Sequence, residues 1–237
     1  MNQTLVIVPT YNEAHTIESA VGGILEFAPE VDVLVVDDNS PDGTGAVADR
    51  LAESDARVQV LHRTSKQGLG PAYLAGFELA MARGYLWVVE MDADGSHRPK
   101  DLPKLLDQKD KADLVIGSRY VLGGEVVNWP AHRQLISRFG NFYARFMLGS
   151  KVRDITAGFR VYRTSLLQRI NLHQVIAKGY AFQVQLTMLS ENLGARIIEV
   201  PITFVERSED QSKMTKSIVF EAFWLVTKWS LRLRNHH

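Results

Sequence analysis

The alternation of short apolar runs with helical stretches over the first 118 residues is the feature that most constrains the fold. Near-continuous apolar runs are typical of strands that are covered on both faces, as the strands of parallel sheets are. Strands are predicted at residues 5–8, 31–36, 57–61, 86–91 and 114–117, and helices at 13–27, 43–54, 71–83 and 99–108. This order predicts an α/β domain with a doubly wound, mostly parallel sheet.

Local signals set the predicted helix boundaries. Asn12 is a residue type that caps helices, so it is predicted to cap the first helix. Pro71 and Pro99 are predicted to lie in the first turns of their helices, where a missing N–H costs nothing.

Polar segments follow four of the predicted strands, at residues 9–13, 37–43, 92–94 and 118–119. The carboxyl ends of parallel strands meet at one edge of a sheet, and ligands of such folds bind there. We therefore expect these four segments to share one edge and to form a binding site.

The pattern changes after residue 118. Helices are predicted at 132–148 and 181–193, strands at 158–162 and 197–204, and a polar loop at 206–216. We expect one domain over residues 1–216 and an amphipathic C-terminal helix over 217–235, which either lies at a membrane interface or packs on the domain. No signal peptide is expected, and no run approaches the roughly 20 apolar residues that span a bilayer.

The charge balance hides an uneven distribution. Lys plus Arg and Asp plus Glu both number 27 in 237 residues, so no nucleic-acid partner is indicated. Residues 1–118 hold 19 acidic and 10 basic residues, whereas residues 119–170 hold 2 acidic and 9 basic residues. The first half suits a cation, and the middle suits a phosphate or an anionic surface. The chain lacks cysteine, so any metal is expected to be held by Asp, Glu or His.

The segment Asp92-Ala93-Asp94 is the sharpest chemical signal. Side chains two residues apart point the same way in an extended segment, and two adjacent carboxylates repel unless a cation lies between them. Hard oxygen ligands favour Mg²⁺ or Mn²⁺ bound to a diphosphate. A polar turn is the alternative, which the position at a strand end makes the weaker one.

Three other groups of residues are less specific. Asp37 and Asp38 are each compatible with two roles, a direct contact with a ligand or a hydrogen bond that braces their loop. Tyr11 and Glu13 are compatible with contacts to a nucleotide base. A stripe spaced by four residues suits either a solvated helix face or a phosphate-binding face; it consists of Arg133, Ser137, Asn141 and Arg145. The Arg207–Lys213 loop is either a surface loop or one that closes over substrate.

Taken together, these segments resemble the dolichol-phosphate mannosyltransferases, or polyprenol monophosphomannose synthases, of glycosyltransferase family two. The resemblance covers about residues 5–214. The residues that carry it lie at 9–13, 37–44, 68–73, 92–97, 99, 118–120, 136–138, 141, 154–156, 158–160, 178–183, 199–202, 207 and 212–213. The segments from Ser118 onward are the ones that indicate a polyprenyl-phosphate acceptor.

The resemblance implies a GT-A fold, GDP-mannose as the donor, a divalent cation, and a polyprenyl (dolichyl-type) monophosphate as the acceptor. For a C-terminal helix at a membrane interface, we expect part of the helix, with the Arg207–Lys216 loop, to rest peripherally on the cytoplasmic face of the membrane, and a membrane-anchoring protein is a compatible partner.

The resemblance also assigns roles to individual residues, of which Asp94, Arg119 and Arg133 are the implied catalytic ones. The guanosine would contact Pro9, Tyr11, Glu13, Val36 and Asp38. The metal and donor diphosphate would contact Asp92, Ala93, Asp94, Ser96, Arg119, Arg207 and Lys213. The acceptor phosphate would contact Arg133 and Ser137. Two departures stand out: Ser96 replaces a Gln found in some members, and Asp210 replaces a usual Gly.

A phosphate monoester explains why no general base stands out in the sequence. Its second pKa is about 6, so it is anionic near pH 7 and can attack the sugar directly. A single displacement would invert the anomeric centre and give a β-linked mannosyl phosphate. Two alternatives stay open: the same acceptor with UDP-glucose or another nucleotide sugar, and a non-catalytic subunit that binds nucleotide or lipid.

Overall fold

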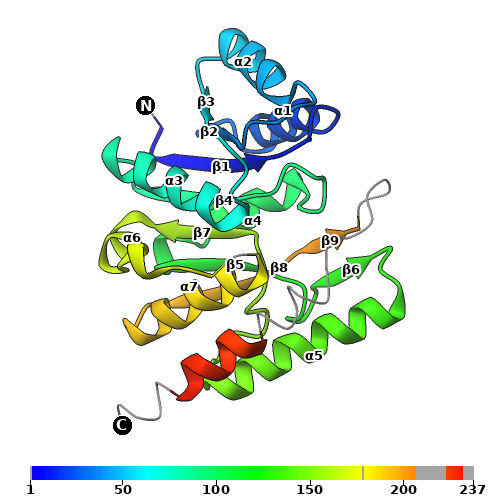
Figure 1. The fold of residues 1–237 in the computed structure, drawn as a ribbon, viewed down its shortest axis with the longest axis vertical. Helices are drawn as coiled ribbons and strands as arrows, with labels where there is room; N and C mark the ends of the chain where they lie inside the picture. Colours follow the sequence, from blue (N-terminus) through cyan, green and yellow to red (C-terminus); the bar gives the residue numbers. More distant parts are fainter. Residues whose placement is uncertain (1, 178, 207–222, 232–237) are drawn as a thin grey trace.

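The computed structural model describes residues 2–177, 179–206 and 223–231. These residues form a seven-stranded sheet in the order β3-β2-β1-β4-β7-β5-β8, in which β7 alone runs antiparallel to its neighbours (Figure 1). The strands are β1 Thr4–Thr10, β2 Val31–Asp37, β3 Val58–His62, β4 Trp87–Glu90, β5 Leu114–Ser118, β7 Arg160–Arg163 and β8 Ile197–Pro201. The predicted mostly parallel sheet is confirmed.

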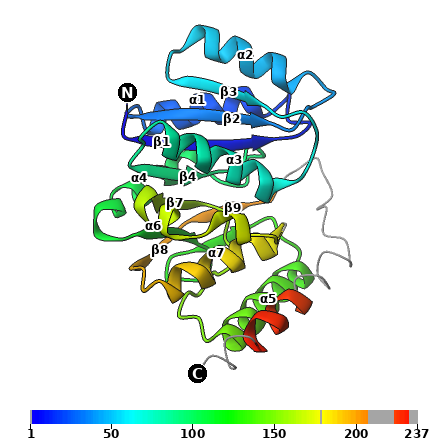
Figure 2. The same cartoon turned by 60° about the vertical axis from the view of Figure 1, so that its left-hand side comes forward.

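Helices cover both faces of this sheet (Figures 1 and 2). One face packs against α3 Leu69–Ala82, α6 Thr164–Arg169 and α7 Tyr180–Asn192. The other packs against α1 Ile17–Phe27, α2 Thr44–Ser54 and α4 Leu102–Leu106. Strand β1 shows why its run is continuously apolar: Leu5 and Ile7 enter the first core, and Val6 and Val8 enter the second.

Close packing of α3 on β1 depends on Gly76. A Cβ atom at this position would lie 2.6 Å from the nearest side-chain atom of Ile7, so any larger residue would push the helix off the sheet. This contact fixes the height of α3 above the strands that carry the site.

A second layer extends beyond the β8 edge. Helix α5, Ala131–Leu148, lies past this edge, and a small parallel sheet pairs β6, Glu125–Val127, with β9, Thr203–Val205. The strand predicted at 197–204 is thus divided: the Ile202 N–H still donates to the Ser118 carbonyl of β5, and the chain then leaves β5 to pair with β6 from Thr203.

The described part of the C-terminal helix, residues 223–231, packs beside α5 in both ribbon views (Figures 1 and 2). Leu225, Val226 and Trp229 of this helix are buried in the core, and Phe223 contacts the ring of Tyr143. Among the described residues, no helix is long and apolar enough to cross a membrane.

Two predicted helix boundaries are wrong. The first helix begins at Ile17, after Thr16, and Asn12 instead has a φ of 60° in the turn before it. The backbone N–H of Asn12 is bound by the Ser40 hydroxyl, which holds this segment against the next loop instead of in a helix. The helix predicted at 99–108 is a 3₁₀ turn over Pro99–Asp101 followed by the short α4.

Candidate active site

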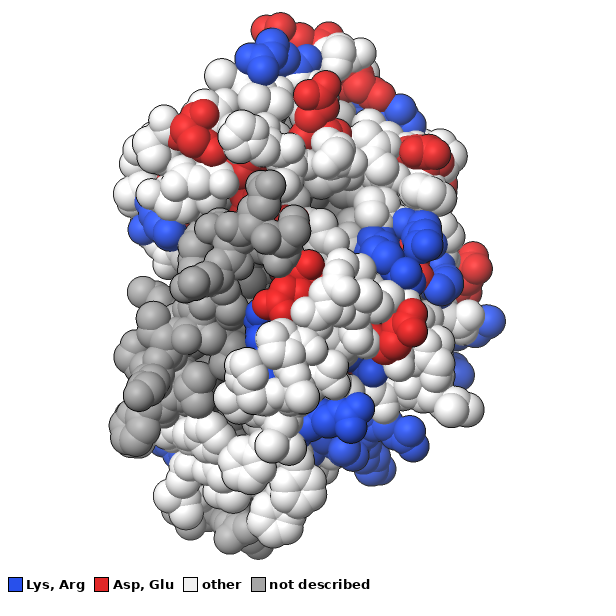
Figure 3. Space-filling model, turned by 90° about the vertical axis from the view of Figure 1, so that its right-hand side faces the viewer, with Lys and Arg blue, Asp and Glu red and all other residues white. Residues whose placement is uncertain are grey.

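The four polar segments lie at one edge of the sheet, as predicted. Strands β1, β2, β4 and β5 run in the same direction, and each leads into one of these segments. The strand order reverses between β1 and β4, which is the place where α/β sheets bind ligands. Figure 3 faces this edge, where acidic side chains are spread over the upper part and basic side chains gather on the right and lower part.

The loops that follow β1 and β2 are joined by hydrogen bonds. The backbone N–H groups of Asn12, Glu13 and Ala14 donate to side chains of the second loop, at 3.1, 2.9 and 3.1 Å. The acceptors are Ser40, Thr44 and Asp42. The two predicted nucleotide-binding loops therefore form one rigid wall.

Tyr11 and Glu13 lie on this wall in a partly buried position. The Lys66 ammonium lies 3.7 Å from the centre of the Tyr11 ring, a cation–π contact that fixes the ring. Glu13 accepts a hydrogen bond from the Thr16 hydroxyl at 2.9 Å. Pro9, at the end of β1, is also partly exposed.

The residues at the end of β2 are buried, so their side chains expose little surface to a ligand. Both Asp37 and Asp38 are buried, and the Val36 side chain lies completely inside the core. Asp37 accepts from the Thr10 and Ser40 hydroxyls, so it braces the loop that follows.

Asp38 reaches the opposite loop. Its carboxylate forms an ion pair with Arg63 and accepts from the backbone N–H groups of Gln67 and Gly68, at 3.1 and 3.3 Å. Gly68 has a φ of 99°, which a residue with a side chain rarely adopts, and this turn brings the start of α3 to the carboxylate. Asp38 thus connects the wall formed by the loops after β1 and β2 to α3.

The Asp92–Asp94 segment follows β4 and is held on both sides. The Asp92 carboxylate accepts from the Tyr73 hydroxyl at 3.0 Å, and its backbone N–H donates to His97 Nδ1 at 3.0 Å. Asp94 accepts from the backbone N–H of Ser96 at 2.8 Å. Ala93 is buried, whereas the Asp92 side chain is 26% exposed.

The donor set fits a divalent cation that also binds a diphosphate. Two carboxylates supply hard oxygen ligands, and diphosphate and water oxygens would complete the coordination. Gly158 leaves room beside them, because a Cβ there would lie 3.8 Å from Asp92 Oδ2. Among the described residues, no three His, Cys, Asp or Glu side chains gather in one metal cluster. Ser96, the third predicted ligand, is buried.

Arg119, directly after β5, is held by a carboxylate and by aromatic rings. Its backbone N–H, Nε and Nη2 donate to Asp154 at 2.8, 2.8 and 2.6 Å, and Nη2 also donates to Thr156 at 2.9 Å. The guanidinium lies 5.2–5.6 Å from three ring centres, those of Tyr120, Trp129 and Phe204. Such a setting fixes both the position and the direction of this cation.

The Asp154–Thr156 loop is itself fixed from beneath by Arg160. This arginine is completely buried in β7, and its guanidinium donates to the carbonyl oxygens of Ile155 and Ala157 at 2.8 and 2.6 Å. The loop that positions Arg119 is therefore anchored to the central sheet.

The stripe spaced by four residues on α5 faces the protein and not the solvent. Arg133 lies over the Trp129 ring and forms an ion pair with Glu206, and Ser137 accepts from the Tyr120 hydroxyl at 2.8 Å. Asn141, one turn further, is buried and donates to Thr156 at 3.0 Å. The structure thus brings Arg133 and Ser137 to the aromatic residues that surround Arg119.

Sequence reasoning assigned no site role to a second set of residues that the structure places around these groups: Tyr73, His97, Tyr120, Trp129, Asp154, Thr156 and Phe204. Tyr73, His97, Tyr120, Asp154 and Thr156 lie in motifs of the resemblance, which was the available signal. Arg207 and Lys213, both predicted to contact donor phosphates, lie outside the described residues.

Comparison with known proteins places the chain in a family. Residues 5–170 match the family model described as glycosyl transferase family 2. The undecaprenyl-phosphate mannosyltransferase of Micrococcus luteus is 54% identical over 232 residues, which are 98% of this chain and 96% of that protein. The polyprenol monophosphomannose synthase of Mycolicibacterium smegmatis is 54% identical over 234 residues, 98% and 88% of the two chains.

Solved structures share the fold at lower identity. The mannosyltransferase PcManGT from Pyrobaculum calidifontis, in complex with GDP-Man and Mn²⁺, has a TM-score of 0.60 and 21% identity over 89% of this chain and 58% of that chain. Glucosyl-3-phosphoglycerate synthase from Mycobacterium tuberculosis, in complex with Mn²⁺ and UDP-glucose, has a TM-score of 0.68 and 21% identity over 97% and 78%. The predicted GT-A fold is confirmed, and the chain belongs to glycosyl transferase family 2.

Proposed function

We propose that this enzyme transfers mannose from GDP-mannose to a polyprenyl monophosphate and inverts the anomeric centre. The observation that carries the proposal is the proximity of two kinds of charged group at one sheet edge. The carboxylates of Asp92 and Asp94 follow β4, and the Arg119 and Arg133 guanidinium groups converge on one aromatic cluster beside it. The names of the two relatives at 54% identity support both the sugar and the acceptor.

The donor side consists of the joined loops after β1 and β2. Tyr11 offers a ring for stacking on the base, and Glu13 offers a carboxylate for its N–H groups. Pro9 lies beside them at the end of β1. Val36 and Asp38 support this wall from the core, so a contact of Val36 with guanosine would come from its backbone.

Asp92 and Asp94, with Ser96 beside them, would hold Mg²⁺ or Mn²⁺ together with the donor diphosphate. When bound, the cation supplies positive charge that stabilises the departing diphosphate. GDP-Man and Mn²⁺ bound to PcManGT, which shares the fold, support this assignment. Arg119, Arg207 and Lys213 would add positive charge on the donor phosphates.

The acceptor side consists of the inner face of α5. Arg133 and Ser137 would bind the acceptor phosphate, whose oxygen attacks the sugar without a protein base because it is already anionic near pH 7. Both oxygens of the Asp154 carboxylate accept hydrogen bonds from Arg119. Its role is therefore to hold Arg119, and the task of the site is to bring two anions together in a fixed orientation.

Helix α5 also offers a surface for the membrane that holds such an acceptor. Its outer face exposes five large apolar side chains, each 50–70% accessible: Leu135, Ile136, Phe139, Phe142 and Phe146. An apolar outer face behind a phosphate-binding inner face suits a helix that lies on a bilayer surface. We place the protein peripherally on the cytoplasmic face of a membrane through α5, with an anchoring protein as the alternative occupant of this face.

Turnover by the purified protein tests the proposal. The assay would offer a short polyprenyl phosphate with GDP-mannose, UDP-glucose and other nucleotide sugars in parallel, with Mg²⁺ or Mn²⁺. GDP release and a mannosyl phosphate product are expected only with GDP-mannose. Preference for UDP-glucose would reassign the donor, and binding without turnover would indicate a non-catalytic subunit.

A further inference from the structure

The hydroxyl group of Tyr73 has no part in the function proposed above, although its position connects it to the metal site. Tyr73 lies on the inner face of α3 and is completely buried. A buried tyrosine hydroxyl needs a hydrogen-bond partner, and this one donates to Asp92 Oδ1 at 3.0 Å. A side chain in the middle of the core thus contacts a carboxylate at the sheet edge.

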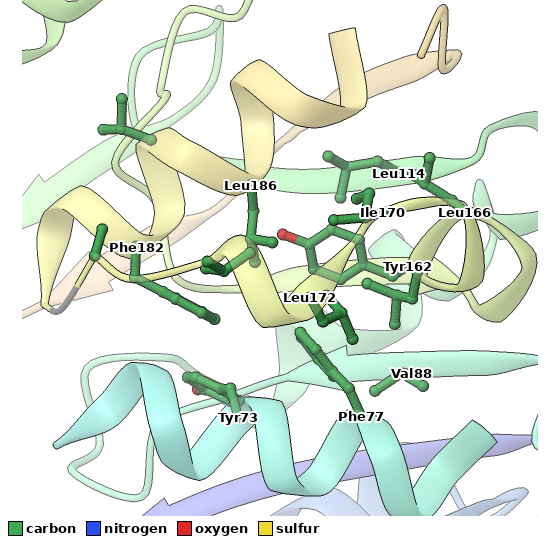
Figure 4. Close-up of a cluster of buried hydrophobic side chains, with 14 of the residues drawn as sticks. Tyr73, Phe77, Val88, Leu114, Tyr162, Leu166, Ile170, Leu172, Phe182 and Leu186 are labelled. Carbon is green, nitrogen blue, oxygen red and sulfur yellow. The ribbon is translucent and has the colours of Figure 1, made fainter. Parts of the chain in front are cut away.

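The Tyr73 ring is fixed by its neighbours. It stacks on Phe182 of α7 with a ring-centre distance of 6.2 Å and an angle of 8° between the planes, and it contacts Phe77 at 6.3 Å (Figure 4). These ring contacts give the hydroxyl a fixed direction toward Asp92.

A second contact holds the Asp92 backbone beside the Tyr73 hydroxyl. Glu90, two residues earlier, is completely buried, and the backbone N–H of Asp92 is bound to His97, which stacks on Phe159. The His97 contact fixes the backbone from which the Asp92 side chain extends. The hydrogen bond from Tyr73 acts on the carboxylate itself, at Oδ1.

We propose that Tyr73 is a positioning residue, whose hydroxyl holds the Asp92 carboxylate in the orientation that binds the divalent cation. The proposal rests on the metal assignment of the function proposed above. Groups that orient a metal ligand from behind typically change metal affinity about 10–100-fold when they are removed. The hydroxyl of Tyr73 is such a group, whereas its ring serves packing.

The substitution Tyr73→Phe separates the two roles, because it removes the hydroxyl and keeps the stacked ring. The matched control is Tyr162→Phe in the same core (Figure 4), where the hydroxyl accepts from Arg160 at 3.1 Å. Mn²⁺ binding in the presence of GDP would be measured by electron paramagnetic resonance on the full chain, with thermal melting recorded for each variant.

Tyr73→Phe is expected to weaken Mn²⁺ binding by about tenfold. Turnover should require more Mn²⁺ for half-maximal rate, with the maximal rate recovered at saturating Mn²⁺. Tyr162→Phe should bind Mn²⁺ as the wild type does, even where its melting temperature falls. Equal Mn²⁺ affinity of Tyr73→Phe and wild type, or equal weakening in both variants, would overturn the positioning role. A wild-type protein that binds no Mn²⁺ would overturn the metal assignment first.

Discussion

The substitution Asp154→Asn should destabilise the protein far more than the same change at a surface site with identical hydrogen bonding. Asp154 is completely buried and accepts three hydrogen bonds from Arg119, which is itself buried. Removal of one partner from a buried ion pair typically costs about 3–5 kcal/mol, because the other charge loses its compensation in a medium of low polarity. We expect a loss of about 3–5 kcal/mol in the free energy of unfolding.

Asp55 provides the matched control. It accepts from the backbone N–H, Nε and Nη2 of Arg57 at 2.9, 3.0 and 2.6 Å, the same three donors in the same order. These two side chains are 30–35% exposed, and exposed pairs contribute at most about 1 kcal/mol. Asp55→Asn should therefore cost less than about 1 kcal/mol.

Urea denaturation of wild type and both variants, followed by circular dichroism, gives the comparison. Mannose transfer at equal folded fraction should also fall in Asp154→Asn and stay unchanged in Asp55→Asn, because only the first pair positions Arg119. Similar losses of stability in the two variants would refute the reasoning that burial sets the contribution of this pair.

Three further predictions concern the metal site, the core and the membrane. Asp94→Ala should abolish transfer without changing the melting temperature, and near-normal turnover at saturating divalent cation would contradict the metal assignment. Burial raises the pKa of Glu90 to about 8, from a value near 4.5 in the unfolded chain. Between these two pH values the folded state holds a proton that the unfolded state has lost. The stability that this group contributes therefore falls as the pH rises from about 4.5 to 8. Glu90→Gln should flatten that slope in urea melts at pH 5, 7 and 9. Phe142→Asn with Phe146→Asn should lower sedimentation with anionic liposomes about tenfold, whereas Phe27→Asn, at an exposed position on α1, should not. Unchanged sedimentation of the double variant would favour an anchoring protein on α5.

The strands and the shared edge could be predicted because their signals are local. Runs such as 31–36 are apolar except for Asp32, and the direction of parallel strands then places the segments after them together. The stripe that contains Arg133 and Ser137 was visible as a spacing of four residues, but spacing alone left open which side it faces. The structure decides that question through the contacts of Ser137 and Asn141.

The partners of the site residues could not be predicted, because they come from elements distant in the sequence. Tyr73 reaches Asp92 from α3, and Asp154 reaches Arg119 across 35 positions. The C-terminal helix shows the same limit: its amphipathic pattern was predicted, yet burial in the core and contact with lipid require the same pattern. Only the packing shows that Leu225 and Trp229 are buried and that five large apolar side chains of α5 are exposed.

The most direct test of the account is the division of the site between donor and acceptor. Arg133→Ala removes a guanidinium on the inner face of α5, and loss of a charged contact to a phosphate typically costs about 2–5 kcal/mol. GDP-mannose and polyprenyl phosphate would be titrated separately, with wild type as reference. The account predicts a large rise in the polyprenyl phosphate concentration needed for half-maximal rate and an unchanged affinity for GDP-mannose. Equal weakening toward both substrates, or weakening toward GDP-mannose alone, would contradict it.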